Sequence, residues 1–455
     1  MPYNNRETLV QRMCAQATPE AARFIADSEF YLPLSALNAA DRLHKGAGEY
    51  AGRNVMLRTH GQLATVLAIL ALDGVARRIL LCPADVSETH IPRLMHDGDA
   101  ELTITDADVR MEINASDERD GAKLPFLDTE WVLFTSGTSG LPKLVLHSFA
   151  SLSAPLGDGL APNHPVWSTF YDIRRYGGLQ ILLRALIGGG SMVLSAAEES
   201  VAAFIARLGD IGATHISGTP SHWRRVLMSG AANKMTPGYI RLSGEMAGQD
   251  ILDCLHTTYP HTKIGHTYAS TEAGVVFSVD DGQAGFPQSV LDAPPPNPDI
   301  RVVNGTLRVR SGAMASCYLG SSIRRLVDDD GYVDTGDMVE QQGERYIFIG
   351  RREGVVNVGG LKVHPEEVEA TINLHPAVAM SRVWGRPSPI MGTLIAADIV
   401  LTPSINGVEH DLPRIRGEII AACRSTLAPH KVPVQLKEVA EIPVMKSGKI
   451  ERHHA

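Results

Sequence analysis

A run of small hydroxyl residues and glycines, closed by a lysine, is the segment of this chain best suited to chemistry. It reads Thr135-Ser136-Gly137-Thr138-Ser139-Gly140-Leu141-Pro142-Lys143 and follows residues 131–134, which have the apolar character of a buried strand. Glycine has no Cβ and tolerates positive φ, so such a loop can bring backbone N–H groups close to a polyphosphate. The four hydroxyls add hydrogen-bond donors and Lys143 adds a point charge. The loop therefore predicts binding of a nucleoside triphosphate.

The composition of this loop alone leaves a second interpretation open. A Ser/Thr/Gly run is equally typical of a flexible surface loop. The run is not a Walker A loop, because that motif requires the pattern G-x-x-x-x-G-K-[ST]. A phosphotransferase built on a Walker loop is therefore disfavoured.

Further motifs follow in order toward the C-terminus, and they decide between these interpretations. They are Tyr268-Ala269-Ser270-Thr271-Glu272, Asp334-Thr335-Gly336-Asp337, Gly350-Arg351-Arg352-Glu353, residues 358–369 with Gly359-Gly360-Leu361-Lys362, and residues 443–452 with Ser447-Gly448-Lys449. Together with the first loop, this ordered set resembles the adenylate-forming superfamily of acyl- and aryl-CoA synthetases, adenylation domains of peptide synthetases, and luciferases. The resemblance runs from about residue 50 to the end of the chain.

The resemblance implies an enzyme that activates a carboxylic acid with ATP. The first step would give acyl-AMP and pyrophosphate with Mg²⁺, and in the second step the thiol of CoA would attack to give a thioester. Catalysis of this kind consists of positioning plus electrostatic stabilisation. The implied class is an AMP-forming acid:CoA ligase, and an aryl or short to medium acyl acid is the first expectation for its substrate.

The resemblance also assigns catalytic roles to individual residues. It places Tyr268 against adenine, where an aromatic ring can stack, and Thr271 at the α-phosphate. Glu272 would hold Mg²⁺, a hard cation that prefers carboxylate and phosphate oxygens. Lys449 would meet the α-phosphate and the acyl oxygen, a task that suits a compact cation on a flexible stem. We expect Thr271, Glu272 and Lys449 to be the catalytic residues.

Further nucleotide contacts are expected from the same motifs. Asp337 and Arg351 would reach the ribose, since a carboxylate suits both ribose hydroxyls. The segment Ser243-Gly244-Glu245 would pass along adenine, and a tight strand-to-helix turn is its alternative interpretation. Three positions in these nucleotide motifs depart from the family pattern. Ser139 stands where a threonine is usual, and Leu144 and Ala269 stand where glycines are usual. The expected cofactor-binding set is completed by Thr135, Ser136, Gly137, Thr138, Ser139, Gly140, Lys143, Tyr268, Ala269 and Ser270.

Two C-terminal segments are expected to take part in a rotation of the C-terminal domain between the two steps. Glu353 stands at the implied hinge, where the family more often has Asp or Lys, and a hinge residue absorbs the backbone change of a domain rotation. Gly359, Gly360 and Lys362 belong to a loop that would replace Lys449 after the rotation. That loop would line the tunnel for the thiol.

The acid pocket is expected at Tyr171, Arg174, Arg175 and Gly178. An arginine takes the place of a common family histidine, and the sequence does not decide between Arg174 and Arg175. An arginine that points inward would pair with a second anionic or polar group on the substrate, because a buried arginine needs a partner. The alternative is that both arginines are solvated surface charges. Gly178 and its aromatic neighbours suggest a flat or slender acyl group, and Asp172 could read an amine.

Alternating apolar segments indicate an α/β fold, with a large N-terminal domain of parallel α/β sheets. A Pro-rich segment precedes a small β-rich subdomain over about residues 285–345, in which Asn304-Gly305 signals a hairpin. We expect an N-terminal domain over residues 1–350, a hinge over 351–354 and a small mobile α+β C-terminal domain over 355–455. Strands are expected at 78–82, 102–105, 192–194 and 215–217, and helices at 86–96, 179–187 and 202–208.

Composition bounds the class of the protein. The 455 residues exceed a single core, so two or more domains are expected. A net charge of −9 without a long basic stripe argues against nucleic acid as a partner. Five scattered cysteines without a C-x-x-C pair favour a reducing compartment. Without a signal peptide or an apolar run of about 18 residues, the sequence predicts a cytoplasmic protein with no membrane span.

Two rival functions stay open. One is a stand-alone adenylating enzyme that loads a carrier protein or an amine, because nothing in the sequence separates a CoA tunnel from a carrier-protein face. The other is a homologue that binds an adenylate without turnover, against which the retention of Glu272, Asp337 and Lys449 argues. The expected partners are a small carboxylic acid, ATP and CoA, with an acyl carrier protein as the alternative acceptor. A homodimer is left open.

Overall fold

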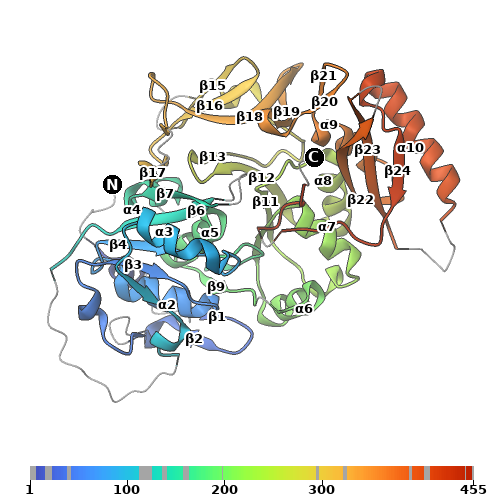
Figure 1. The fold of residues 1–455 in the computed structure, drawn as a ribbon. Coiled ribbons are helices and arrows are strands. Elements are labelled where there is room, and N and C mark those ends of the chain that lie inside the picture. Colours follow the sequence, from blue (N-terminus) through green and yellow to red (C-terminus); the bar gives the residue numbers. More distant parts are fainter. Residues whose placement is uncertain are drawn as a thin grey trace. The chain divides into compact units, whose positions relative to one another are not determined.

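The computed structural model divides the chain into two compact units (Figure 1). Unit 1 comprises Met1–Ser217, Tyr268–Val276 and Arg310–Val333, and unit 2 comprises Gly218–Thr267, Phe277–Val309 and Asp334–Ala455. The domain boundaries expected near residues 350 and 355 stay predictions. The structure describes residues 7–15, 23–37, 42–111, 125–135, 141–156, 163–196, 198–293, 297–320, 325–388, 392–403, 410–445 and 447–452.

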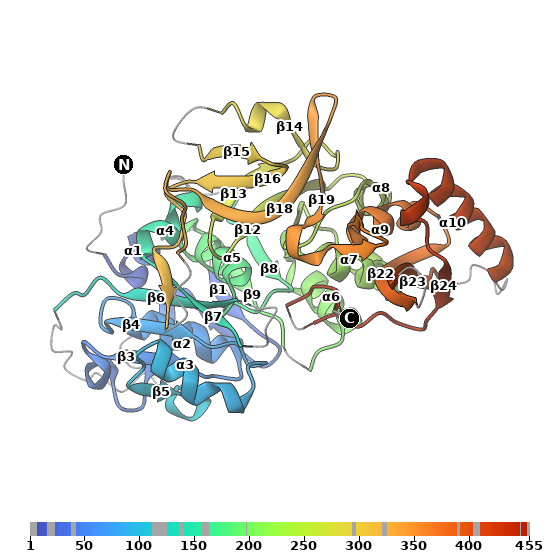
Figure 2. The ribbon, with the colours of Figure 1, turned by 45° about the horizontal axis from the view of Figure 1, so that its top comes forward.

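Unit 1 contains a six-stranded sheet in the order β17-β7-β6-β4-β3-β5. Its strands are β3 (Asn54–Leu57), β4 (Arg78–Leu81), β5 (Leu102–Ile104), β6 (Glu130–Thr135), β7 (Lys143–His147) and β17 (Cys317–Leu319). The pairs among β3, β4, β5 and β6 are parallel, whereas β7 runs antiparallel to both β6 and β17. Helices α2 (Gln62–Leu72) and α3 (Ile91–Asp97) lie beside these strands (Figures 1 and 2). Ile91 and Leu94 of α3 pack into a buried cluster with Leu80 and Val132.

A second group of strands in unit 1 has the order β10-β8-β9-β1-β2. Its members are β1 (Phe24–Ala26), β2 (Tyr31–Pro33), β8 (Val166–Thr169), β9 (Ser191–Val193) and β10 (His215–Gly218). All of these pairs are parallel except β1 with β2. Helices in this part of the chain are α1 (Leu9–Ala15), α4 (Phe149–Ser153), α5 (Tyr176–Ile187) and α6 (Val201–Ile211). Most of α5 is buried, because apolar side chains occupy nearly every position from Leu179 to Ile187.

Unit 2 combines a parallel strand pair with a five-stranded sheet. The parallel pair is β11 (Tyr239–Ser243) with β12 (Lys263–Ser270), accompanied by α7 (Pro220–Met228) and α8 (Gln249–Thr258). The last three residues of β12 and the first three of β13 (Gly274–Val279) are counted with unit 1. The five-stranded sheet has the order β14-β19-β18-β16-β15, seen in Figure 2. Asn304 and Gly305 join β15 to β16 with φ of 52° and 76°, which confirms the expected hairpin. Its strands are β14 (Phe286–Pro287), β15 (Asp299–Val303), β16 (Thr306–Arg310), β18 (Val333–Gln342) and β19 (Arg345–Arg351).

The last hundred residues form an α+β arrangement within unit 2. A three-stranded sheet, β22-β23-β24, is flanked by α9 and α10 (Figure 1). Val368 and Ile372 of α9, and Ile415 and Ile419 of α10, share a buried cluster with Ile395. The elements are β20 (Val356–Val358), β21 (Leu361–Val363), α9 (Pro365–Asn373), β22 (Val378–Ser388), β23 (Gly392–Leu401), α10 (Leu412–Thr426) and β24 (Gln435–Glu438).

The expected α/β class is confirmed, with two corrections. The sheets are not wholly parallel, since β2, β7 and β17 pair antiparallel to their neighbours. The helix expected over residues 86–96 begins only at Ile91, with Pro92 in its first turn, where a missing backbone N–H costs nothing. Among the helices that the structure describes, none is both long and apolar enough to cross a membrane.

Candidate active site

The two ends of the glycine-rich loop lie on paired strands. β6 ends at Thr135 and β7 begins at Lys143, and these two residues are direct partners in the antiparallel pair. Trp131, Leu133 and Val145 are fully buried and anchor both strands. The pairing therefore holds Thr135 and Lys143 at one end of the sheet. The other predicted phosphate-binding residues of the loop, Ser136, Gly137, Thr138, Ser139 and Gly140, lie outside the described residues.

A tyrosine connects the lysine of this loop with the predicted metal ligand. Tyr318 donates a hydrogen bond from its hydroxyl to Glu272 Oε1 at 3.0 Å. The Nζ atom of Lys143 lies 5.6 Å from the centroid of the Tyr318 ring, within cation–π range. β17 brings Tyr318 here, because it pairs with β7 and sets Tyr318 opposite Val145. Lys143, Glu272 and Tyr318 are called the Glu272 cluster below.

The backbone that carries Thr271 and Glu272 is held from two sides. His147 donates from Nε2 to the Thr271 carbonyl at 2.8 Å, and its Nδ1 lies 2.9 Å from Ser151 Oγ. The amide of Ala315 donates to the Glu272 carbonyl at 2.9 Å. These contacts fix the main chain while both side chains remain partly exposed. The segment is therefore rigid in its backbone and accessible at its functional groups.

The strand end that precedes this segment carries the other predicted adenine contacts. Tyr268, Ala269 and Ser270 close β12 and are each partly exposed. Ser270 accepts a hydrogen bond from the Ala273 amide at 2.9 Å, which turns the chain just beyond Thr271. The roles predicted for these three residues toward the nucleotide stay predictions.

The two predicted ribose ligands are neighbours. Asp337 on β18 and Arg351 on β19 are paired in the strand register, and Arg351 Nε donates to Asp337 Oδ1 at 2.9 Å. Thr335 accepts a hydrogen bond from the Asp337 amide at 3.2 Å, which fixes the start of the carboxylate side chain. Glu353 follows in an exposed 3₁₀ turn, Arg352–Gly354. The structure thus brings Asp337 together with Arg351, the first residue of the predicted hinge segment 351–354.

A short hairpin near the C-terminus presents Lys449. Val444 and Ile450 form an isolated antiparallel bridge, and the Met445 amide donates to the Lys449 carbonyl at 2.8 Å. The turn requires Gly448, whose φ of +80° lies in the left-handed region that glycine adopts without penalty. Residues 443–451 are called the Lys449 hairpin below. Within unit 2 this hairpin contacts Glu245, so the structure brings two of the predicted site segments together.

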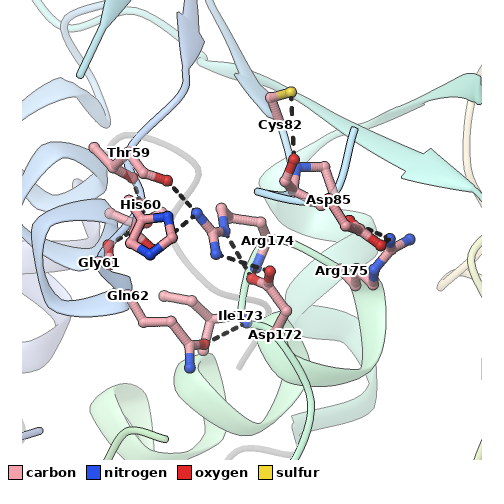
Figure 3. Close-up of polar contacts among 12 residues, drawn as sticks. Thr59, His60, Gly61, Gln62, Cys82, Asp85, Asp172, Ile173, Arg174 and Arg175 are labelled. Atoms are coloured by element: carbon pink, nitrogen blue, oxygen red, sulfur yellow. Dashed lines mark hydrogen bonds and ion pairs between the residues drawn. The ribbon is translucent and has the colours of Figure 1, made fainter. Parts of the chain in front are cut away.

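The predicted acid-pocket arginines are both engaged by carboxylates (Figure 3). Arg174 is only 3% exposed and makes two hydrogen bonds of 2.8 Å to the Asp172 carboxylate, besides contacts with the Thr59 and His60 carbonyls. Arg175 reaches both carboxylate oxygens of Asp85 at 2.7 Å. The alternative that both arginines are solvated surface charges is therefore wrong for Arg174. Its burial is balanced by an internal ion pair, which also occupies the Asp172 carboxylate.

Tyr171 and Gly178 have structural reasons for their identity. Tyr171 is buried. A Cβ on Gly178 would lie 2.3 Å from the Asp172 carbonyl oxygen, so the first turn of α5 can approach that backbone only with glycine. Close packing against the Asp172 backbone therefore explains why residue 178 is a glycine. A role of Gly178 in shaping the acyl site stays a prediction.

The residues predicted for the thiol tunnel form the turn between β20 and β21. Gly359 and Gly360 have φ of 58° and 90°, and the Gly360 amide donates to Asn357 Oδ1 at 2.9 Å. Lys362 is exposed on β21. The positive φ angles explain why both positions of this turn are glycines. The role of these residues in a thiol tunnel stays a prediction.

Sequence reasoning missed several residues at these sites. Tyr318 and His147 gave no local signal, because their roles depend on strand pairing and on segments far apart in the chain. Thr219 and His222, which contact the Lys449 hairpin, did have a signal. Thr219 precedes Pro220 at the start of a helix, and Thr at the N-cap before Pro at N1 is a recognisable helix start.

Two buried histidines give the protein a defined acid sensitivity. Burial lowers the pKa of His147 to about 4, against the opposing effect of its bond to the Thr271 carbonyl, and lowers the pKa of His222 to about 3. In the unfolded chain the pKa of both histidines is about 6.5. At pH values between this pKa and the lower pKa of the folded state, the unfolded state therefore binds more protons than the folded state. The free energy of unfolding should therefore decrease as pH falls below about 6.5.

This decrease can be followed by measuring Tm from pH 7.5 to 4.5. A His147→Gln variant should show a shallower fall in Tm over this range than the unchanged protein. A parallel fall in both proteins would contradict the assignment of the acid sensitivity to His147.

Comparison with known proteins gives the family. Residues 112–319 match the family described as AMP-binding enzyme, and residues 367–449 match the AMP-binding enzyme C-terminal domain. The human mitochondrial acyl-coenzyme A synthetase ACSM1 is 26% identical over 420 residues, which cover 86% of this chain and 71% of that protein. The 2-succinylbenzoate–CoA ligase of Bacillus velezensis is 27% identical over 390 residues, covering 79% and 76%. The chain belongs to the adenylate-forming superfamily.

Solved structures of this superfamily share the fold over nearly the whole chain. The anthranilate CoA ligase AuaEII, in complex with anthranoyl-AMP, superposes with a TM-score of 0.78 at 16% identity and covers 98% of this chain and 96% of its own. The amide bond synthetase McbA of Marinactinospora thermotolerans gives a TM-score of 0.77 at 19% identity, covering 97% of each chain. At these identities the likeness establishes the adenylate-forming fold.

Proposed function

We propose that this adenylate-forming protein is an AMP-forming carboxylic acid:CoA ligase. The observation that carries the proposal is the Glu272 cluster, in which a carboxylate and a lysine lie beside the strands that begin and end the phosphate loop. The match of both family regions and the similarity to two CoA ligases support the same reaction.

The proposed reaction has two steps that share one intermediate. In the first, a carboxylate oxygen of the acid attacks the α-phosphorus of ATP, the bond to the bridging oxygen breaks, and pyrophosphate leaves. Lys449 and Thr271 would stabilise the charge that develops on the α-phosphate and acyl oxygens. In the second, the CoA thiol sulfur attacks the acyl carbon, AMP leaves, and the thiol proton is released to solvent. The product is a thioester.

Mg²⁺ fits Glu272 as an ion shared with the phosphates of the substrate. In the parts of the chain that the structure describes, no three His, Cys, Asp or Glu side chains gather as a metal site. Mg²⁺ is usually held by one or two carboxylates together with substrate phosphates. Glu272 supplies one such carboxylate, oriented by Tyr318. When bound, Mg²⁺ would neutralise charge on the departing pyrophosphate.

Replacing Tyr318 with phenylalanine tests this orientation. Loss of the hydroxyl leaves Glu272 without one hydrogen bond, and bonds to charged groups are the stronger ones. We expect the Mg²⁺ concentration for half-maximal pyrophosphate release to rise by about three- to tenfold. The rate at saturating Mg²⁺ should change little. Tyr346→Phe is a matched control, because the Tyr346 hydroxyl donates to the side-chain oxygen of the exposed Gln341. An equal shift in both variants would contradict the assignment.

For the acid, we propose an aryl or short to medium acyl group without a second carboxylate. Arg174 and Arg175 are the cations nearest in sequence to the predicted pocket residue Tyr171, and Asp172 and Asp85 already pair with them. A dicarboxylic acid would have to displace one of these ion pairs. The names of ACSM1 and AuaEII support an acyl or aryl acid, whereas the 2-succinylbenzoate–CoA ligase is named for an acid with a second carboxylate.

The experiment is pyrophosphate release with ATP, Mg²⁺ and a panel of aryl, short and medium acyl, and dicarboxylic acids, with and without CoA. Release that depends on one monocarboxylic class and accelerates with CoA supports the ligase. Acid-dependent release that does not change with CoA would contradict the CoA ligase and favour a carrier protein or an amine as the acceptor. The amide bond synthetase McbA shares the fold of this chain. Absence of release with every acid would contradict an enzymatic role and favour the adenylate-binding alternative.

A further inference from the structure

Glu245 joins the Lys449 hairpin to the first turn of α7. Its Oε2 atom accepts a hydrogen bond from the Ser221 amide at 2.9 Å, and its Oε1 atom accepts one from the Ile450 amide at 2.9 Å. Ser221 lies at the start of α7, where backbone N–H groups have no partner within the helix and favour a negative charge. One carboxylate thus connects the first turn of α7 with Ile450, which lies 205 residues beyond Glu245 in the chain.

Thr219 makes the matching contact on the other side of Lys449. As the N-cap of α7, Thr219 Oγ1 accepts from the His222 amide at 3.1 Å, and it donates its proton to the Gly448 carbonyl at 2.6 Å. The Gly448 carbonyl belongs to the peptide group that precedes Lys449, and the Ile450 amide belongs to the peptide group that follows it. Both peptide groups that flank the Lys449 Cα are therefore held, one by Thr219 at the N-cap of α7 and the other by Glu245, which itself accepts from the first turn of that helix.

We propose that Glu245 is a positioning residue, which together with Thr219 fixes the Lys449 backbone for the first half-reaction. This inference rests on the proposed function and gives Glu245 a role other than the adenine contact expected from the sequence. Both of its carboxylate oxygens accept backbone N–H groups, and such charge-assisted bonds are stronger than neutral ones. The second half-reaction, in which the hairpin would leave, requires both bonds to break.

The test measures the two half-reactions separately in Glu245→Ala and Glu245→Gln. Acid-dependent pyrophosphate release reports the first step, and thioester formation from supplied acyl-adenylate and CoA reports the second. We expect Glu245→Ala to lower kcat of the first step about tenfold with the KM for ATP unchanged, while the second step is retained or faster. Glu245→Gln should fall between, since its amide keeps one acceptor oxygen. Glu367→Gln, a partly buried glutamate paired with Lys431, is the matched control.

Three outcomes would overturn the positioning role. A raised KM for ATP with kcat unchanged would indicate that Glu245 contacts adenine, as expected from the sequence, and does not position Lys449. An equal loss of rate in both half-reactions would indicate that Glu245 only stabilises the start of α7. The third outcome concerns hydrogen exchange, which is independent of turnover: if the peptide containing residues 443–452 exchanges equally fast in Glu245→Ala and the unchanged protein, the carboxylate does not hold the hairpin.

The exchange measurement also separates this inference from the proposed function. If the unchanged protein releases no pyrophosphate with any acid, the ligase proposal fails. Faster exchange over residues 443–452 in Glu245→Ala, without a change in the Glu367→Gln control, would still support the hold on the hairpin in that case.

Discussion

Replacing Lys449 with alanine is expected to lower the rate of acid-dependent pyrophosphate release by about two to three orders of magnitude. Both peptide groups that flank Lys449 are held in place. Thr219, the N-cap of α7, donates to the Gly448 carbonyl, and Glu245 accepts from the Ile450 amide. A cation fixed in this way needs no reorganisation when charge develops on the α-phosphate and acyl oxygens, and such preorganised stabilisation is the largest single contribution in many enzymes. The measurement is initial-rate pyrophosphate release at saturating ATP and acid.

The same variant should retain the second half-reaction. In the proposed reaction the hairpin that carries Lys449 leaves before the CoA thiol attacks, so the rate of thioester formation from supplied acyl-adenylate and CoA should change by less than about threefold. Lys437→Ala is the control, because Lys437 is an exposed lysine of the same unit, on β24. If Lys449→Ala released pyrophosphate at close to the unchanged rate, or lost both steps equally, Lys449 would not be the catalytic cation.

The elements that carry the site were largely predictable, because their signals are local. The apolar run before Thr135 predicted β6, and Asn304-Gly305 predicted the turn between β15 and β16. Ser447-Gly448-Lys449 marked the lysine, although the hairpin that presents it was not predicted. Strand patterns, turn residues and family motifs each depend on a few neighbouring residues, so one sequence suffices to find them.

The partners of the site residues were not predictable, because they come from distant parts of the chain. Tyr318 and its acceptor Glu272 are 46 residues apart, and Glu245 and Ile450 are 205 apart. Strand pairing and helix packing decide these contacts, and neither appears as a pattern in one segment. The motif named Glu245 as a predicted site residue, but its two hydrogen-bond partners could not be read from the sequence.

Arg174 is an instructive exception, since its main partner is local. Asp172 lies only two residues away and forms a buried ion pair with it, a contact that the sequence spacing permits. The sequence did not reveal that Arg174 is buried, or that it also donates to the Thr59 and His60 carbonyls more than 110 residues away. A buried arginine with an internal carboxylate has no need of a substrate anion. This is why the proposed acid carries a single carboxylate.

Gly448→Ala is expected to slow the first half-reaction by about a hundredfold, although it changes no functional group. An alanine Cβ at this position would lie 1.9 Å from His222 Cε1, and the φ of +80° is itself unfavourable for a residue with a Cβ. His222 is buried and its backbone amide bonds to Thr219, so the ring has little room to move. The hairpin must shift instead, and a displacement of about 1 Å can cost about a hundredfold in rate.

Gly343→Ala separates this steric effect from backbone strain. Gly343 has φ of +61° in the same unit, but nothing lies within 4 Å of the position its Cβ would take. Its replacement should cost stability through strain alone and leave both half-reactions intact. Gly448→Ala should in contrast slow the first half-reaction about a hundredfold, because its Cβ would clash with the His222 ring. Adding His222→Ala to Gly448→Ala removes the clashing ring and should restore part of the first half-reaction. If Gly448→Ala alone kept the unchanged rate, the docked hairpin would not be the form that carries out adenylation.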